Sequence, residues 1–142
     1  MKKEIADKWV EALRSGNYKQ GMSALRSKED EYCCLGVLCE VLGLEAKISI
    51  HNTTYIYDGR GDLLPRTARE LANMKSENGS VYGYILANSD NELFSEKEEE
   101  YFDNNTYPHP YPSRYNSLSE VNDDGITFDR IADFIEKNYQ LL

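Results

Sequence analysis

The ten residues from Cys33 to Leu42, CCLGVLCEVL, are apolar except at Gly36 and Glu40. This segment limits the fold most, because a segment that is apolar on every side has to be buried on every side. At this length, periodicity alone does not separate a buried helix from a buried strand. The Leu, Cys and Glu content and the following Gly43 favour a helix. A glycine inside a helix destabilises it by about 1 kcal/mol relative to alanine. Gly36 therefore predicts that another backbone passes close by.

All three cysteines lie in or at the start of this predicted helix, at Cys33, Cys34 and Cys39. Zinc sites use four ligands, usually in two close pairs, and His51 and His109 fall far apart in regions of different character. A disulfide is equally unexpected, because adjacent cysteines bridge only through a strained ring. We interpret the thiols as core side chains. The alternative is a nucleophile at the helix start, but the four preceding charges are mostly negative.

Three further segments carry clear periodicity. Residues 4–15 space apolar side chains three and four apart and end at Gly16, which predicts a helix. Residues 46–62 alternate β-branched and aromatic residues around turn signals, which predicts a hairpin or two short strands. Residues 65–73 begin with a proline at a first-turn position and predict another helix.

The other segments are shorter or less regular. A short helical turn is expected around residues 22–25, and a strand over residues 81–86. LSEV predicts a helical turn, and Thr127 is a plausible N-cap for a last amphipathic helix. An acidic, Tyr/Pro-rich insertion at about residues 95–115 contains PHPYP, through which neither a helix nor a central strand can run.

Together these elements predict one compact α+β domain over residues 1–142, with about four helices packed on a small antiparallel sheet. A chain of this length buries a core without disulfides or metals. We expect no cofactor. No window approaches the roughly 18 apolar residues of a membrane span. The charged N-terminus and the odd number of cysteines indicate a soluble protein in a reducing compartment, the cytoplasm.

The charge of the chain is unevenly distributed. Residues 1–75 carry twelve Lys/Arg against eleven Asp/Glu, a net charge of +1, whereas residues 76–142 carry four against fourteen, a net charge of −10. Affinity for DNA or RNA depends on cations that neutralise phosphates, so this balance argues against binding a nucleic-acid polymer. A local positive pocket could still hold a small phosphorylated ligand.

One polar segment has the composition of such a pocket. In SGNYKQG, two glycines bracket Tyr18, Lys19 and Gln20; the second is Gly21, and Arg26 follows. Backbone amides and cations bind phosphate, tyrosine stacks on a base, and an amide side chain bonds to base or ribose edges. We therefore predict a ligand site here. The alternative is a turn between helices whose tyrosine packs under it and whose lysine is solvated.

Arg66, Asn122 and Asp123 are outlying candidates for the same site. NDDG, which contains two of them, matches only part of the sequence pattern of a calcium-binding loop. A turn that leads into a helix explains it better, and no metal site is expected. The common P-loop, dinucleotide-binding, metalloprotease and serine-hydrolase signatures do not occur in the sequence.

Four stretches in this order, KWVEALRSGNYKQGMSALRS, YCCLGVLCEVLG, LLPRTARELANM and LSEVNDDGITFDRIADFIE, resemble a family of small proteins encoded by bacteriophages and prophages. No activity is firmly assigned to that family. The resemblance covers most of the chain and fails mainly over residues 46–60 and 95–115. It implies a small accessory protein in the host cytoplasm, a class that includes proteins that counter host immunity.

Three hypotheses of different classes follow. The first is a non-catalytic binder that sequesters a small nucleotide-derived signalling molecule. Such a protein is expected to form a homo-oligomer, because pockets at subunit interfaces exclude water. The second is an acidic inhibitor that docks on a host defence protein through residues 77–124, possibly as a nucleic-acid mimic. The third is an enzyme that uses Cys33 or Cys34.

Overall fold

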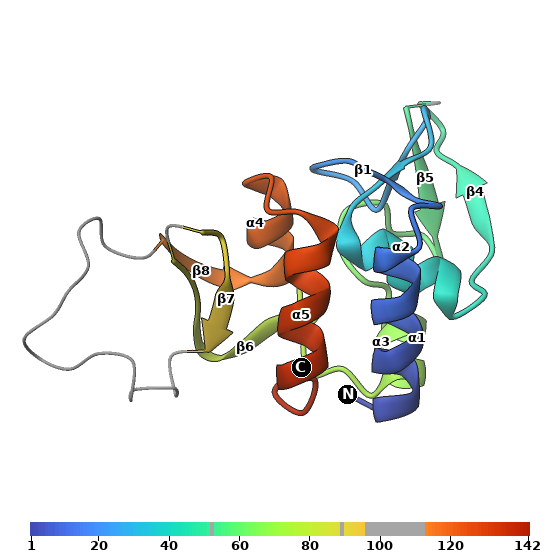
Figure 1. Cartoon of the computed structure of the whole chain (residues 1–142). Helices are drawn as coiled ribbons and strands as arrows, with labels where there is room; N and C mark the ends of the chain where they lie inside the picture. Colours follow the sequence, from blue (N-terminus) through green and yellow to red (C-terminus); the bar gives the residue numbers. More distant parts are fainter. Residues whose placement is uncertain (52, 89, 96–112) are drawn as a thin grey trace, which may run out of the picture.

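The computed structural model describes residues 1–51, 53–88, 90–95 and 113–142. Within these residues the chain forms five helices and eight strands (Figure 1). The helices are α1 (Lys3–Arg14), α2 (Cys34–Val41), α3 (Arg66–Ala72), α4 (Leu118–Asp123) and α5 (Phe128–Asn138). The strands are β1 (Lys19–Gln20), β2 (Arg26–Ser27), β3 (Glu31–Tyr32), β4 (Ala46–Ile48), β5 (Thr54–Tyr57), β6 (Ser80–Ala87), β7 (Leu93–Ser95) and β8 (Ser113–Ser117).

The strands form two sheets. The first has the order β1-β3-β2-β5-β4, in which β1 and β3 are parallel and the other neighbours antiparallel. The second has the antiparallel order β7-β6-β8. In Figure 1 the sheets lie on opposite sides of α1 and α5. The predicted α+β class is confirmed, and the structure adds a fifth helix and a second sheet to the expected arrangement.

Helix α2 lies in the centre of the core, as its composition predicts. Its residues from Cys34 to Cys39 are all buried, and so is Cys33, which precedes the helix. The indole Nε1 of Trp9, on α1, donates a buried hydrogen bond of 2.8 Å to the carbonyl of Cys34. Helix α1 also packs along α5, so three helices share one apolar interior.

Gly36 is the position at which another backbone crosses α2. A Cβ added to Gly36 would lie 1.7 Å from the carbonyl oxygen of Leu25. The Leu25 segment is fixed there from both sides, because Leu25 N donates to Gly61 O at 2.7 Å and Cys33 N donates to Leu25 O at 3.3 Å. The expected close backbone approach is therefore confirmed.

The helical turn expected around residues 22–25 is wrong. That segment forms bends between β1 and β2, and Ser23 has a positive φ of 64°. Its backbone groups bond to distant parts of the chain, as Leu25 does with Gly61, and not to the next helical turn. Tertiary partners therefore override the local pattern here.

The remaining predictions, which concern the C-terminal half of the chain, are largely confirmed. Strand β6 covers the predicted strand, and Thr127 occupies the N-cap of α5, although its side chain makes no capping hydrogen bond there. Of the insertion predicted at about 95–115, residues 96–112, including His109, lie outside the described residues. Its margins belong to β7 and β8. None of the described helices combines the length and apolar character that a membrane crossing requires.

Both ends of the described chain are held beside the C-terminal end of α3 and the residues that follow it. Lys2 N donates to Ala72 O, and Lys75 N donates to Leu142 O, each at 2.9 Å. The amino group of Met1 donates to Tyr139 O at 2.8 Å. Figure 1 shows the N and C labels side by side as a result.

We expect Gly36→Ala to lower the free energy of unfolding by about 3 kcal/mol or more, because the new methyl group would force two backbones apart. Urea denaturation followed by circular dichroism measures the loss. Gly43→Ala is the matched control. Gly43 has a φ of +70° and open space around an added Cβ, so only its backbone conformation opposes alanine, by about 1 kcal/mol. If both variants lost the same free energy of unfolding, the close approach of the Leu25 backbone would not explain the effect at Gly36.

Candidate functional site

The predicted SGNYKQG corner meets α4, and Gln20 and Asn122 are in contact there. Gln20 Nε2 donates to Ile126 O at 2.8 Å and to Asn122 Oδ1 at 3.3 Å. Gln20 Oε1 accepts a hydrogen bond of 3.1 Å from Phe128 N. The structure thus brings together two predicted site residues that are far apart in the sequence, and it uses both ends of the Gln20 amide inside the chain.

Asn122 is fully buried and is also saturated with partners. Its Oδ1 accepts from Cys34 N at 3.0 Å, at the start of α2, and its Nδ2 donates to Gly21 O at 2.8 Å. Gly21 is packed so closely that an added Cβ would lie 2.7 Å from the Cβ of Glu31. Gln20, Gly21 and Asn122 therefore hold three segments together, and their polar groups do not face an empty site.

Arg26 lies in a cluster of tyrosines at the same end of the molecule. Its guanidinium lies 4.0 Å from the ring centroid of Tyr55 and 5.2 Å from that of Tyr32. It also forms ion pairs of 2.6 Å with Asp30 and 3.4 Å with Glu40. Partial burial acts to lower its pKa, but the bond to Asp30 and neighbouring groups raise the pKa of Arg26 above its ordinary value. Arg26 is therefore a permanent, internally paired cation.

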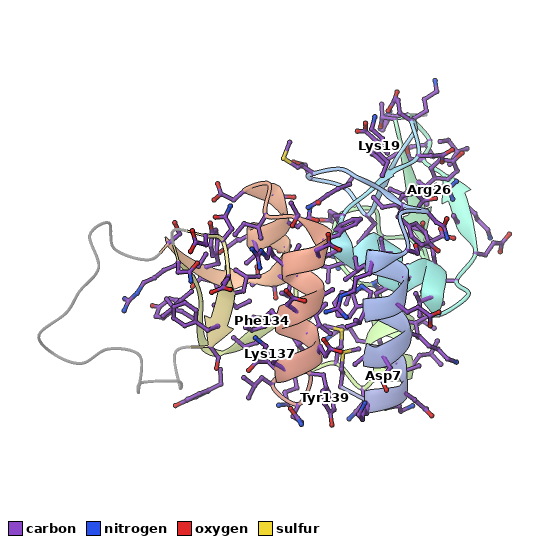
Figure 2. The ribbon with its side chains drawn as sticks, viewed as in Figure 1. Asp7, Lys19, Arg26, Phe134, Lys137 and Tyr139 are labelled. Atoms are coloured by element: carbon purple, nitrogen blue, oxygen red, sulfur yellow. The ribbon has the colours of Figure 1, made fainter. Side chains whose placement is uncertain are left out.

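Of the predicted ligand contacts in the corner, Lys19 is exposed, whereas Tyr18 is half-buried and packs against the core. The ring of Tyr18 meets that of Tyr32 edge-on, with centroids 5.1 Å apart. Lys19 is exposed and forms an ion pair of 2.5 Å with Glu31. In Figure 2, Lys19 and Arg26 lie at the same end of the molecule, away from Lys137 and Tyr139.

Arg66 does not join the corner. It lies on α3, which Figure 1 places toward the opposite end of α1 from β1. Its guanidinium forms an exposed ion pair of 2.6 Å with Glu70, one helical turn away. All three cations of the predicted site, Lys19, Arg26 and Arg66, thus have a carboxylate partner within the chain.

Asp123 connects the corner to an open hollow of about 590 Å³ between α4 and β8. Its Oδ1 accepts a hydrogen bond of 2.9 Å from Ser23 N, in the loop that follows the corner. Of the residues that the structure describes, three carboxylates and one guanidinium line the hollow, which gives this lining a net negative charge; the residues are Ser113, Arg114, Tyr115, Glu120, Asp123 and Asp124.

The carboxylates of this acidic hollow are held in place by neighbouring donors. Tyr115 Oη donates to Asp124 Oδ2 at 2.5 Å, and Asn116 N donates to Glu120 Oε2 at 2.7 Å. Burial, and then the bond to Asp124, raise the pKa of Tyr115, which keeps its hydroxyl a donor. Sequence reasoning missed Glu120, Asp124, Arg114 and Tyr115. The dense charge of SEVNDDG was the available signal, but the contribution of β8 depends on tertiary structure.

A second hollow of about 360 Å³ lies between the β4–β5 hairpin and α3. Its lining mixes apolar and charged side chains: Leu44, Glu45, Lys47, Ile56, Asp58, Gly59 and Thr67. The polar groups pair with one another, because Thr67 Oγ1 bonds to Asp58, and Lys47 forms an ion pair with Glu45. This hollow presents no cluster of one charge.

The structure confirms that all three cysteines are buried, and they are free thiols. Burial raises the pKa of Cys33 to about 11, and it also raises the pKa of Cys34 and of Cys39. A nucleophilic cysteine needs a lowered pKa and access to substrate. These thiols are instead buried, and their pKa values are raised. In the described ranges, no group of three or more His, Cys, Asp or Glu side chains could hold a metal ion.

A family model described as a domain of unknown function (DUF8296) matches residues 1–139. No curated protein matches the chain, and neither does any solved structure.

We expect Asn122→Ala to lower the free energy of unfolding by about 3 kcal/mol, because it removes the partner of the buried Cys34 N and of the half-buried Gly21 O. Thermal and urea denaturation measure the effect. Asn116→Ala is the control, since among the described residues the Asn116 side chain bonds only to exposed Glu120; its effect should stay within about 0.5 kcal/mol. A loss in Asn122→Ala no larger than in the control would show that the amide does not hold the junction.

We also expect the native thiols to react with iodoacetamide at least about tenfold more slowly than those of the denatured chain. The native rate should stay below the denatured rate at every pH between about pH 7 and pH 9, because a raised pKa leaves a smaller fraction of each thiol as the reactive thiolate. The denatured chain should react faster as the pH approaches the ordinary thiol pKa of 9.0. Mass spectrometry of quenched samples reports both rates. Rapid native alkylation of Cys33 or Cys34 would favour the enzyme hypothesis.

Proposed function

This chain belongs to the DUF8296 family, and from its site geometry we propose that it is a non-catalytic binding protein that docks on a basic surface of a partner protein. The observation that carries the proposal is the acidic hollow. In the described part of the chain, Glu120, Asp123 and Asp124 line it together with one cation, Arg114. Such a surface attracts lysine and arginine side chains and repels phosphate.

The charge of the surrounding chain reinforces this local preference. Residues 76–142 carry a net charge of −10, and the acidic hollow lies within that half. An acidic field steers a basic partner toward the surface and raises the association rate more than the affinity. The resemblance to bacteriophage-encoded proteins supports a more specific form of the proposal, in which the partner is a defence protein in the host cytoplasm.

Sequestration of a nucleotide-derived molecule stays a second prediction, with less support from the geometry. Tyr18 and Lys19 lie near the surface, where an aromatic ring and an amine could contact a base and a phosphate. A phosphate would, however, have to compete with Glu31 for Lys19, and with Asp30 and Glu40 for Arg26. The amide groups of Gln20 and Asn122 are already bonded within the chain.

The charge of the hollow can be removed without changing its shape. In Glu120→Gln/Asp123→Asn/Asp124→Asn, each amide oxygen can still accept the hydrogen bond that the carboxylate accepts. We expect wild-type protein to retain a basic partner from host lysate at low salt and to release it at high salt. The triple variant should retain at least about tenfold less of it, because the attraction is electrostatic. Quantitative mass spectrometry identifies and compares the retained proteins.

The matched control is Glu4→Gln/Glu11→Gln/Asp129→Asn, which removes the same charge from exposed positions on α1 and α5. It should retain the partner as wild type does. The proposal fails if no salt-sensitive partner appears or if the triple variant retains it fully. Titration calorimetry with cyclic nucleotides and ADP-ribose derivatives tests the second prediction. Binding heat that is lost in Lys19→Gln would favour it over docking on a protein.

A further inference from the structure

We propose that β4 is a self-association edge, through which two copies of the chain pair antiparallel and join their five-stranded sheets across a two-fold axis. Strand β4 is the terminal strand of that sheet, after β5. In Figure 1 it lies on the outer side of the molecule. This proposal is independent of the acidic hollow, which lies between α4 and β8.

The outward side of β4 presents unpaired backbone groups, within the part of the chain that the structure describes. Ser49 N donates to Thr54 O at 2.8 Å, so Ser49 faces β5. Tyr57, opposite Ala46, uses its own N–H and C=O with Arg60 at 2.7 and 3.0 Å. Because bonding alternates along an antiparallel pair, the N–H and C=O groups of Ala46 and Ile48 point away from β5, toward an incoming strand.

The charges of β4 and the preceding residue are complementary to those of a second copy. When Ala46 lies opposite Ala46 of the second copy, Glu45 lies opposite Lys47 of that copy. By symmetry, Lys47 lies opposite Glu45 of the second copy. Glu45 and Lys47 are free to re-pair, because their side chains are 79% and 68% exposed and their own contact is long, at 3.4 Å. A shift of the pairing by two residues, which moves the two-fold axis from Ala46 to Lys47, would instead place Lys47 opposite Lys47, which is unfavourable. Charge therefore selects both the partner and the register.

Apolar side chains at this edge add to the preference. Ile48 is 45% exposed and Ile50, in the turn after β4, is 94% exposed. In the proposed register Ile48 lies opposite Leu44 of the second copy, on the other face from the charged pair. Lysine on an edge strand usually opposes pairing. Here Glu45 of a second copy would neutralise Lys47, so the edge favours pairing with an identical strand.

Sedimentation velocity of the full chain, from micromolar to high micromolar concentrations, tests the proposal. Wild type should form a reversible dimer. Lys47→Glu places glutamates opposite glutamates, and Glu45→Lys places lysines opposite lysines. Each variant alone should dimerise at least about tenfold more weakly than wild type. An equimolar mixture of the two variants should recover the dimer, because every cross-strand pair is again of opposite charge. The doubly exchanged Glu45→Lys/Lys47→Glu chain should also recover it.

Circular dichroism checks that each variant is folded. Glu11→Lys, on the exposed side of α1, is the control for a simple change of net charge and should dimerise as wild type does. The proposal is overturned if wild type is monomeric throughout the range. It is equally overturned if the single variants dimerise as wild type does, or if the mixture stays monomeric.

Discussion

The structure depends on the buried amide of Asn122. One side chain accepts from the first turn of the central helix α2 and donates to the loop after β1. Gln20 extends the same junction to the start of α5. Because the Asn122 amide is buried, loss of its bond to Cys34 N would leave a buried donor unsatisfied. The first and last thirds of the chain are therefore fixed to each other at a single point.

That junction also explains how the molecule divides structural and recognition roles. The polar side chains with the strongest chemical resemblance to ligand contacts, Gln20 and Asn122, hold the backbone. Arg26 is enclosed by Tyr32, Tyr55 and two carboxylates, so it stabilises the five-stranded sheet. Groups available to other molecules lie at the periphery, where the acidic hollow faces one side and β4 the other. Recognition through such groups does not require the core to move.

Sequence patterns predict the elements that bury a periodic face. Helices α1 and α5, the all-apolar α2 and the β4–β5 hairpin follow from spacing and turn residues, and Gly36 even indicates the backbone that crosses it. Strands β1, β2 and β3 could not be predicted in this way, because two residues carry no periodicity and their pairing is non-local. The partners of Asn122 and Asp123 lie about a hundred positions away in the sequence, and no local pattern encodes them.

The positions of Met1 and Leu142 beside the segment after α3 have a topological consequence. The backbone is almost a closed ring, and a linker of a few residues could join its ends. A circularly permuted chain, opened at an exposed turn, would then keep α1 and α5 adjacent while it changed the sequence separation between them. The architecture would be insensitive to where the polypeptide starts, whereas the order in which its parts meet during folding would not.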